Sequence, residues 1–213
     1  MSAPDRPHLW RPGPGGPPLL LLHATGGDET SLLPYHERLA PAAPVLAVRG
    51  TVVENGLNRY FRRFSEGVFD EVDLVERVGE LVEFLAAAES HYGVAPGDWM
   101  AVGFSNGANI AAAVLLLRPD ALAGAILLRA MVPLAEPPRI ELNGQPVLIV
   151  SGGQDPIARP DNAVRLADLL RRAGAAVEHE ILPAGHALSN LDVALARRWW
   201  NEVGSRTGAA LVS

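Results

Sequence analysis

The feature that most constrains this chain is a serine between two glycines at residues 103–107, which read Gly-Phe-Ser-Asn-Gly. An apolar run at 99–104 leads into Ser105, and an alanine-rich apolar run at 110–117 follows it. A strand that reverses directly into a helix needs small residues on both sides of the turn, because the two backbones approach closely there. The pattern therefore predicts a strand, a sharp turn and a helix, with the Ser105 hydroxyl exposed at the apex.

Apolar runs alternate with helical patterns along the rest of the chain. Strands are expected over 17–23, 45–48, 99–104, 124–128, 145–150 and 177–182. One helix is expected to follow the turn at 23–29 and to end at Leu39, and others are expected over 68–91, 105–118, 163–170 and 188–200. The four leucines at 19–22 have no polar alternation, which is typical of a parallel strand buried on both faces. The alternation implies right-handed crossovers, and it predicts an α/β fold with a mostly parallel sheet and helices on both faces.

Two of these helices carry more specific expectations. Asp28 or Thr30 is expected to cap the helix that ends at Leu39. The helix over 68–91 is expected to be half-exposed, because apolar residues recur in it at helical spacing. The apolar positions of that helix are Val68, Val72, Val75, Val78, Val82 and Leu85.

The length of 213 residues fits one sizeable domain, which is expected to span 1–213. Residues 1–16 are rich in proline and glycine and are expected to form an irregular lead-in or one short edge strand. Residues 50–67 follow the strand at 45–48, at the carboxyl edge of the sheet, which is where ligands bind in this class of fold. They are interpreted as a substrate-side insertion.

Composition excludes several classes of function. The formal net charge of -6 opposes nucleic-acid binding, which depends on clustered Lys and Arg. The absence of cysteine excludes disulfides, a cysteine nucleophile and thiolate metal sites, and it agrees with a reducing cytoplasm. The first residues do not have the pattern of a secretory signal, and no run approaches the roughly 20 apolar residues that span a bilayer. A cytoplasmic protein without membrane insertion is expected.

A nucleophilic serine needs a base, and two histidines follow Ser105 in the chain. His179 lies in the interior of the strand at 177–182, whereas His186 stands in the loop that leaves this strand. Functional groups collect at the carboxyl ends of parallel strands, so His186 is favoured over His179.

An acid is expected between the serine and the histidine in chain order. Asp155 directly follows the strand at 145–150, whereas other later aspartates stand at helix boundaries or within helical patterns. A serine hydroxyl is a weak nucleophile, so His186 would take its proton while Asp155 orients the imidazole. Taken singly, Asp155 could be an ordinary turn aspartate and His186 an ordinary loop histidine. Three such residues in the right order, each at a strand end, rarely occur together by chance.

The charge that develops on a substrate carbonyl oxygen during attack needs fixed hydrogen-bond donors. The backbone N–H of Asn106 is one candidate by position, and that of Thr25, in the first glycine turn, is the other. His23 precedes this turn; it is expected to shape the turn rather than to react, and it is counted among the substrate-side residues.

The segment after the strand at 45–48 interleaves aromatic residues with arginines. Arg49, Tyr60, Phe61 and Phe64 are predicted to bind substrate, with the aromatic side chains walling the acyl or alcohol pocket. An amphipathic surface turn with solvated arginines is the alternative for this segment.

These residues resemble the α/β-hydrolase superfamily, and within it the small bacterial phospholipase/carboxylesterase branch related to acyl-protein thioesterases. The resemblance covers nearly the whole chain and rests on segments 21–29, 49–56, 103–109, 151–157 and 185–186. It implies a serine esterase without a separate lid domain, a cofactor or a metal. Ser105, Asp155 and His186 would form its catalytic triad, and the resemblance is consistent with a homodimer. The family usually has His-Gly where this chain has His23-Ala24, so the Ala24 methyl is expected to restrict the backbone beside Thr25.

Small soluble carboxylic esters are the expected substrates, because only the connections after Val48 and after Leu128 are long enough to roof the site. A lysophospholipase or an acyl thioesterase is the alternative within the family, and a peptidase remains open because acyl transfer uses the same groups. A dienelactone-type hydrolase with a cysteine nucleophile is excluded by composition. A non-catalytic ligand-binding module on the same fold is disfavoured because all three triad residues are present.

Overall fold

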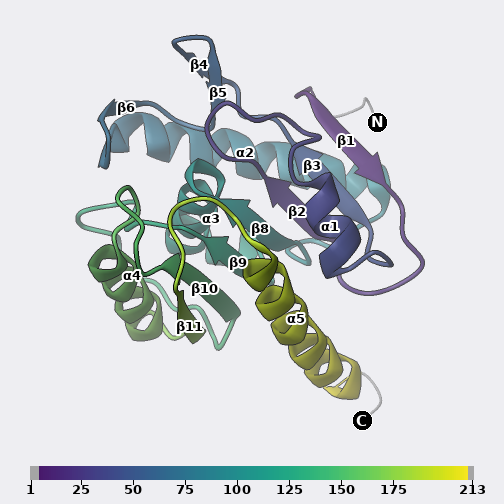
Figure 1. Cartoon of the computed structure of the whole chain (residues 1–213). Helices are drawn as coiled ribbons and strands as arrows, with labels where there is room; N and C mark the ends of the chain where they lie inside the picture. The colour runs from purple at the N-terminus through teal and green to yellow at the C-terminus, as the bar shows by residue number, and fades with distance from the viewer. Residues whose placement is uncertain (1–4, 211–213) are drawn as a thin grey trace.

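The structure is a computed structural model that describes residues 5–210, with side chains as far as Val203. Figure 1 shows a central twisted sheet with helices packed against both of its faces. The seven strands lie in the order β1-β3-β2-β8-β9-β10-β11, and every neighbouring pair is parallel except β1 with β3. The prediction of a mostly parallel α/β sheet is confirmed.

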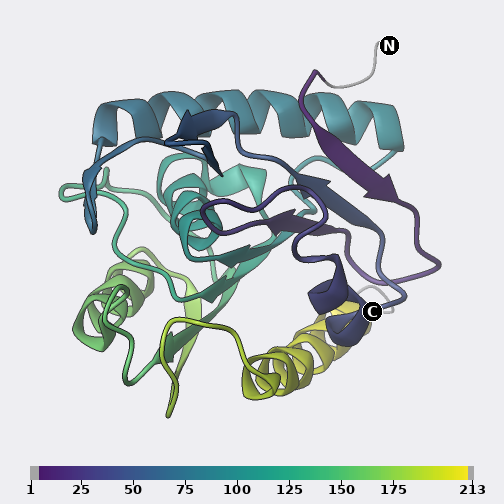
Figure 2. The same ribbon diagram turned by 45° about the horizontal axis from the view of Figure 1, so that its top comes forward.

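The strands of this sheet are β1 (His8–Arg11), β2 (Leu19–Leu22), β3 (Val45–Val48), β8 (Met100–Phe104), β9 (Gly124–Leu128), β10 (Pro146–Gly152) and β11 (Ala176–Leu182). The helices are α1 (Leu33–Leu39), α2 (Glu71–Tyr92), α3 (Asn106–Leu117), α4 (Pro160–Arg172) and α5 (Asn190–Ala210), with a short 3-10 turn at Pro119–Ala121. Helices α2, α3 and α4 cover one face of the sheet, and α1 and α5 cover the other (Figure 2).

The leucine run explains why the sheet is buried on both sides. Leu20 and Leu22 of β2 pack into the core beneath α2 and α3. Leu19 and Leu21 point to the opposite face and pack with residues of α1 and α5. Successive side chains of a strand alternate between faces, so a strand covered by helices on both sides has no position for a polar residue.

The start of the described chain contains an edge strand. His8 lies opposite Val48, and Arg11 lies opposite Val45, in antiparallel pairing with β3. This part of the chain was expected to be an irregular lead-in or one short edge strand, and the structure has the strand.

The segment at 50–67 folds into hairpins. β4 (Val52–Glu54) pairs with β5 (Leu57–Arg59) across a two-residue turn, in which Asn55 has φ 52° and Gly56 has φ 78°. Positive φ at both positions matches the right-handed twist of a tight hairpin, and the pair Asn-Gly is well suited to it. A second hairpin joins β6 (Arg63–Ser65) to β7 (Val68–Phe69).

Helix α2 differs from the sequence-based expectation at its start and on its buried face. The carboxylate of Asp70 accepts the Asp73 N–H at 3.1 Å and caps the helix, so Val68 belongs to the preceding hairpin. Val72 is 81% exposed, and Val75 is exposed too. The face that packs on the core carries Val78 and Leu85 of the expected set together with the larger Leu74, Leu81 and Phe84. Two apolar stripes share part of this helix, and the stripe with more apolar area is the buried one.

The expected cap of α1 is also different. The helix begins only at Leu33 and has no side-chain cap. Asp28 instead accepts hydrogen bonds from Thr30 and from the Ser31 hydroxyl, which closes a turn ahead of the helix. An aspartate bonds as readily to a local turn as to a helix start, so sequence position alone does not separate the two.

The two stripes of α2 can be distinguished by substitution. Leu74→Ala should lower the free energy of unfolding by about 2–5 kcal/mol, because it leaves a cavity under the helix. Val72→Ala is the matched control on the same helix and should change it by less than about 0.5 kcal/mol. Urea unfolding followed by circular dichroism measures both, and equal losses would contradict this placement of the helix.

Candidate active site

Ser105 stands at the strained turn between β8 and α3. Its φ of 53° and ψ of -114° are unusual for a residue with a side chain. A Cβ at Gly103 would lie 2.5 Å from the Gly107 carbonyl oxygen, and a Cβ at Gly107 would lie 2.0 Å from the Leu22 carbonyl oxygen. Both glycines are therefore required by close backbone packing, as the sequence pattern indicates.

Three predicted residues from three separate strand ends are brought together here. The Oγ of Ser105 lies 3.0 Å from Nε2 of His186, and Nδ1 of His186 lies 2.8 Å from Oδ2 of Asp155. The Asp155 side chain is completely buried, whereas that of His186 is partly exposed. The imidazole therefore bridges a buried carboxylate and a hydroxyl at the edge of the sheet, which is the geometry that proton transfer from the hydroxyl requires.

The loops that carry Asp155 and His186 are packed against each other. Oδ1 of Asp155 accepts the backbone N–H groups of Ile157 at 2.8 Å and of Ala158 at 3.0 Å. A Cβ at Gly152 would lie 2.4 Å from the Gly185 carbonyl oxygen, so only glycine allows the two loops to approach this closely.

The other candidate base, His179, lies elsewhere. Its Nε2 is 2.8 Å from the hydroxyl of Ser151, between β10 and β11. Burial lowers the pKa of His179. The structure therefore brings His186, and not His179, to Ser105.

The proposed oxyanion donors lie in neighbouring segments. The N–H of Asn106 is the first of α3, where no helical acceptor exists, and within the described residues the Thr25 N–H has no acceptor either. The contact of Gly107 with the end of β2 presses the first turn of α3 against the segment that leads into Thr25.

The turn at 24–27 is held by the first hairpin. Gly26 N–H donates to the Asn58 carbonyl at 2.8 Å, and the Asn58 side chain donates to the Gly27 carbonyl at 2.8 Å. Nη1 of Arg59 donates to the Thr25 hydroxyl at 2.8 Å. Positive φ occurs at Gly26, not at Ala24, so the alanine methyl does not meet the backbone restriction expected for it.

His23 is buried and shapes the turn. Its Nε2 accepts the Gly50 N–H at 3.0 Å, which leaves Nδ1 to donate to the Ala24 carbonyl at 2.6 Å. Both ring nitrogens are satisfied only in the neutral form, and burial lowers the pKa of His23. Its side chain lies inside the protein, where it offers no surface to a ligand.

The predicted aromatic pocket is corrected by the structure. Tyr60 and Phe61 are completely buried, so neither presents a surface to a substrate. The Tyr60 hydroxyl accepts the His23 N–H at 3.0 Å and donates to the Val48 carbonyl at 2.5 Å, which ties the ends of β2 and β3 together. Burial raises the pKa of this hydroxyl. Phe64 is 76% exposed on the second hairpin, at the start of α2.

Arg49 is engaged by a carboxylate of its own chain. Its Nη2 donates to Oε1 of Glu29 at 2.7 Å, in a bidentate pair. The Arg49 guanidinium lowers the pKa of Glu29. The cation predicted to bind substrate is thus paired in this structure.

Two charged groups beside the site were missed by the sequence analysis. Arg129 follows β9 directly, and it forms a completely buried ion pair with Asp192 of α5 at 2.7 Å. A single arginine after five apolar residues was the available signal, since a buried cation needs a reason to be there.

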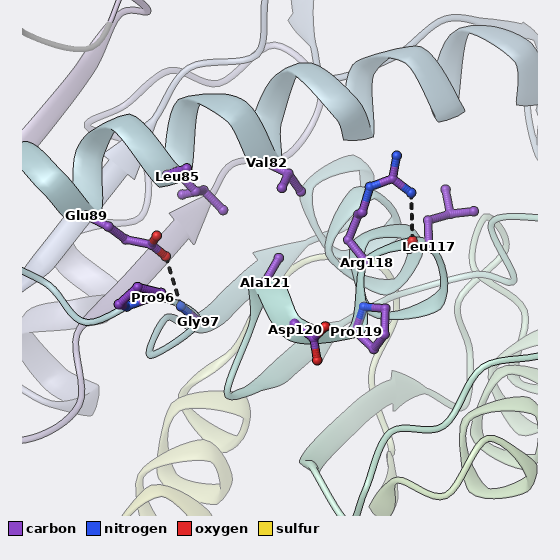
Figure 3. Close-up of a pocket in the computed structure, with 11 residues that line it drawn as sticks. Val82, Leu85, Glu89, Pro96, Gly97, Leu117, Arg118, Pro119, Asp120 and Ala121 are labelled. Carbon is purple, nitrogen blue, oxygen red and sulfur yellow. Dashed lines mark hydrogen bonds between the residues drawn. The ribbon is translucent and has the colours of Figure 1, made fainter.

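A hollow of about 270 Å³ lies between α2 and the segment after α3, with the apolar side chains of Val82, Leu85 and Ala121 around it (Figure 3). It is at the opposite end of α3 from Ser105. Within residues 5–210, no group of three or more His, Asp or Glu side chains is arranged to hold a metal ion, and no helix has the length and apolar character needed to cross a membrane.

No protein-family model matches the chain, but individual proteins do. A Bacillus subtilis (strain 168) protein named "Putative hydrolase MhqD" is 42% identical over 195 residues, which are 92% of this chain and 98% of that protein. The crystal structure of the Bacillus cereus carboxylesterase is 42% identical with a TM-score of 0.91, and the match covers 93% of this chain and 94% of that one. A carboxylesterase from Mesorhizobium loti is 32% identical with a TM-score of 0.86, over 92% of this chain and 96% of that one.

The fold and these likenesses define an α/β-hydrolase without a separate lid domain. Such identity over nearly the full length of both chains also shows the family. The chain belongs to the phospholipase/carboxylesterase-type family of α/β-hydrolases, and it is an ester-hydrolysing enzyme.

The buried neutral state of His23 predicts a pH dependence of stability. Below a pH of about 6.5, His23 takes up a proton in the unfolded chain, whereas its lowered pKa keeps it neutral in the folded chain. The unfolded state then binds more protons, so the free energy of unfolding falls as the pH drops. His23→Gln removes this titration and keeps an acceptor for Gly50 N–H. Between about pH 7 and pH 5 the melting temperature of the wild type should fall more than that of the variant; parallel curves would contradict the assignment.

Proposed function

We propose that the protein is a serine carboxylesterase in which Ser105 is the nucleophile, His186 the general base and Asp155 the orienting acid. The observation that carries the proposal is the continuous chain of hydrogen bonds from Ser105 Oγ through His186 to Asp155. The position of Ser105 on a strained strand-to-helix turn supports the same roles, because such a turn exposes the serine hydroxyl at the edge of the sheet.

The reaction proceeds in two halves. Ser105 Oγ attacks the ester carbonyl while its proton passes to Nε2 of His186, and collapse of the tetrahedral species expels the alcohol, which takes that proton. A water molecule then attacks the acyl-serine and gives its proton to His186. The second collapse releases the acid and returns the proton to Ser105. Asp155 accepts a hydrogen bond from Nδ1 throughout and stabilises the imidazolium.

The backbone N–H groups of Thr25 and Asn106 are the proposed donors to the oxyanion. Their support is that neither N–H has an acceptor among the described residues, and that the turn around Thr25 is held by β5 rather than free to move. Fixed donors stabilise the charge without reorganisation at the moment of attack.

Small, water-soluble carboxylic esters are the proposed substrates. Leu57 lies beside the turn at 24–27: its Cδ2 would be 3.2 Å from a Cβ at Gly26, and its side chain is half-exposed. Leu57 replaces Tyr60 and Phe61 as the proposed apolar wall. A short hairpin of this kind covers a few methylene groups and does not form a long acyl tunnel, which favours short acyl groups. A lysophospholipase or an acyl thioesterase is therefore only the second candidate.

A cytoplasmic location and a homodimer belong to the same proposal. The absence of cysteine agrees with a reducing compartment. Light scattering of the purified protein decides between a monomer and a dimer.

The roles of the triad can be tested by labelling and kinetics. A fluorophosphonate probe should label the wild type and not Ser105→Ala. Asp155→Asn and His186→Ala should each lower kcat about 10³-fold or more, because one loses the correct imidazole orientation and the other loses the base.

His179→Ala is the matched control, since His179 is the other histidine that follows Ser105 in the chain. It should change kcat by no more than about threefold, because a ring hydrogen-bonded to Ser151 does not reach the nucleophile. Loss of activity in this variant, or labelling of Ser105→Ala, would overturn the assignment.

The substrate class can be tested with p-nitrophenyl esters of increasing acyl length. Each buried methylene contributes about 0.8 kcal/mol, so kcat/KM should rise up to about fourfold per carbon while the pocket is being filled. The rise is expected to stop at roughly six carbons, with no increase at the micelle threshold. A rise through twelve or more carbons, or a jump when micelles form, would support the lysophospholipase instead.

A further inference from the structure

Arg129 occupies an unusual place at the carboxyl edge of the sheet. It lies one residue beyond β9, its side chain is completely buried, and its φ of 56° falls in the left-handed region that residues other than glycine rarely adopt. Its N–H still donates to the Val150 carbonyl at 2.9 Å, so the residue remains attached to β10. In Figure 1, β9 lies between β8, which carries Ser105 at its end, and β10.

All five N–H donors of the guanidinium are used. Nη1 donates to Oδ1 of Asp192 at 2.7 Å and to the Val150 carbonyl at 3.2 Å. Nη2 donates to Oδ2 of Asp192 at 3.2 Å and to the Ala187 carbonyl at 3.4 Å, and Nε donates to the Gly185 carbonyl at 2.9 Å. A planar fork is the only side-chain group that supplies five donors in fixed directions.

Two of these carbonyl acceptors lie on the loop that carries His186. Gly185 and Ala187 are the two neighbours of His186, so the guanidinium is bonded to the chain on both sides of the imidazole. Nε of Arg129 also lies 4.0 Å from Oδ2 of Asp155, the oxygen that faces the imidazole. One buried cation thus contacts the backbone beside the base and approaches the acid.

Asp192 connects this cation to the surrounding helices. Its Oδ2 accepts both the N–H and the hydroxyl of Ser189, at 2.7 and 2.8 Å, and its carbonyl accepts the Tyr35 hydroxyl at 3.2 Å. The loop that carries His186 is therefore bonded to the start of α5 and, through it, to α1.

Stability alone does not account for such a pair. Removing two charges from water is unfavourable, and well-packed apolar residues of similar volume often replace a buried ion pair without loss of stability. We propose that Arg129, clamped by Asp192, is a positioning residue that holds the Gly185–Ala187 loop so that His186 keeps both of its partners. The inference rests on the proposed catalytic role of His186.

The test uses two variants that remove different parts of the contact. Arg129→Met with Asp192→Leu removes both charges, so no unpaired charge is left buried. Arg129→Lys retains a cation for Asp192, but a compact ammonium has three donors and cannot span the Gly185 and Ala187 carbonyls. Displacement of a catalytic group by about 1 Å lowers the rate by about 100-fold. For p-nitrophenyl acetate we expect kcat to fall about 100-fold in the double variant and by a smaller factor in Arg129→Lys. In both variants KM should stay within about threefold of the wild type.

Two further measurements separate positioning from a general loss of stability. The low-field NMR resonance of the proton between His186 and Asp155 should weaken or shift in both variants. Leu74→Ala, which is destabilised on the far side of the core, should keep its resonance and its kcat. If a folded double variant keeps kcat within about threefold, the proposal is overturned. If the double variant does not fold, Arg129→Lys decides by the same criterion.

The proposed function has its own readout. If Ser105→Ala retained labelling and activity, the triad would be wrong whatever Arg129 does. If only the positioning role is wrong, labelling still depends on Ser105 and the Arg129 variants turn over substrate at the wild-type rate.

Discussion

The close approach of α3 to the ends of β2 and β8 is the constraint on which the rest of this site depends. Gly103 and Gly107 have no space for a Cβ, and Ser105 between them adopts a positive φ. This packing directs the first N–H groups of the helix toward the edge of the sheet, and free N–H groups at a helix N-terminus are suited to stabilise an anion. A longer side chain at either glycine would separate the helix from the strand.

The carboxyl edge of the sheet is held together by buried polar side chains. Parallel strands end with backbone groups that the sheet no longer pairs, and buried groups of this kind need partners. The Tyr60 hydroxyl joins the ends of β2 and β3, His23 joins the turn at 24–27 to Gly50, and Arg129 joins β10 to the loop around His186. His23, Tyr60 and Arg129 are therefore more deeply buried than Ser105 and His186.

The differences between sequence and structure have physical reasons. The face of α2 was misjudged because a run of valines and a run of larger residues both recur at helical spacing, and only the neighbouring sheet decides which is buried. The first hairpin carried a readable signal in Asn55-Gly56, which was missed because its strands are only three residues long. Tyr60 and Phe61 were placed at a pocket because exposed and buried aromatic residues look alike in a sequence.

The sequence by itself determined the strand order along the chain, the parallel sheet buried on both faces, and the three residues that meet at its edge. It could do so because these depend on local patterns: apolar runs, glycines where backbones touch, and polar residues directly after strands. Only the tertiary structure decided that His23 and Tyr60 are internal supports, and that Arg129 pairs with Asp192. Those contacts join residues far apart in the chain, and pairing at such separations depends on how the strands are arranged, which no local pattern encodes.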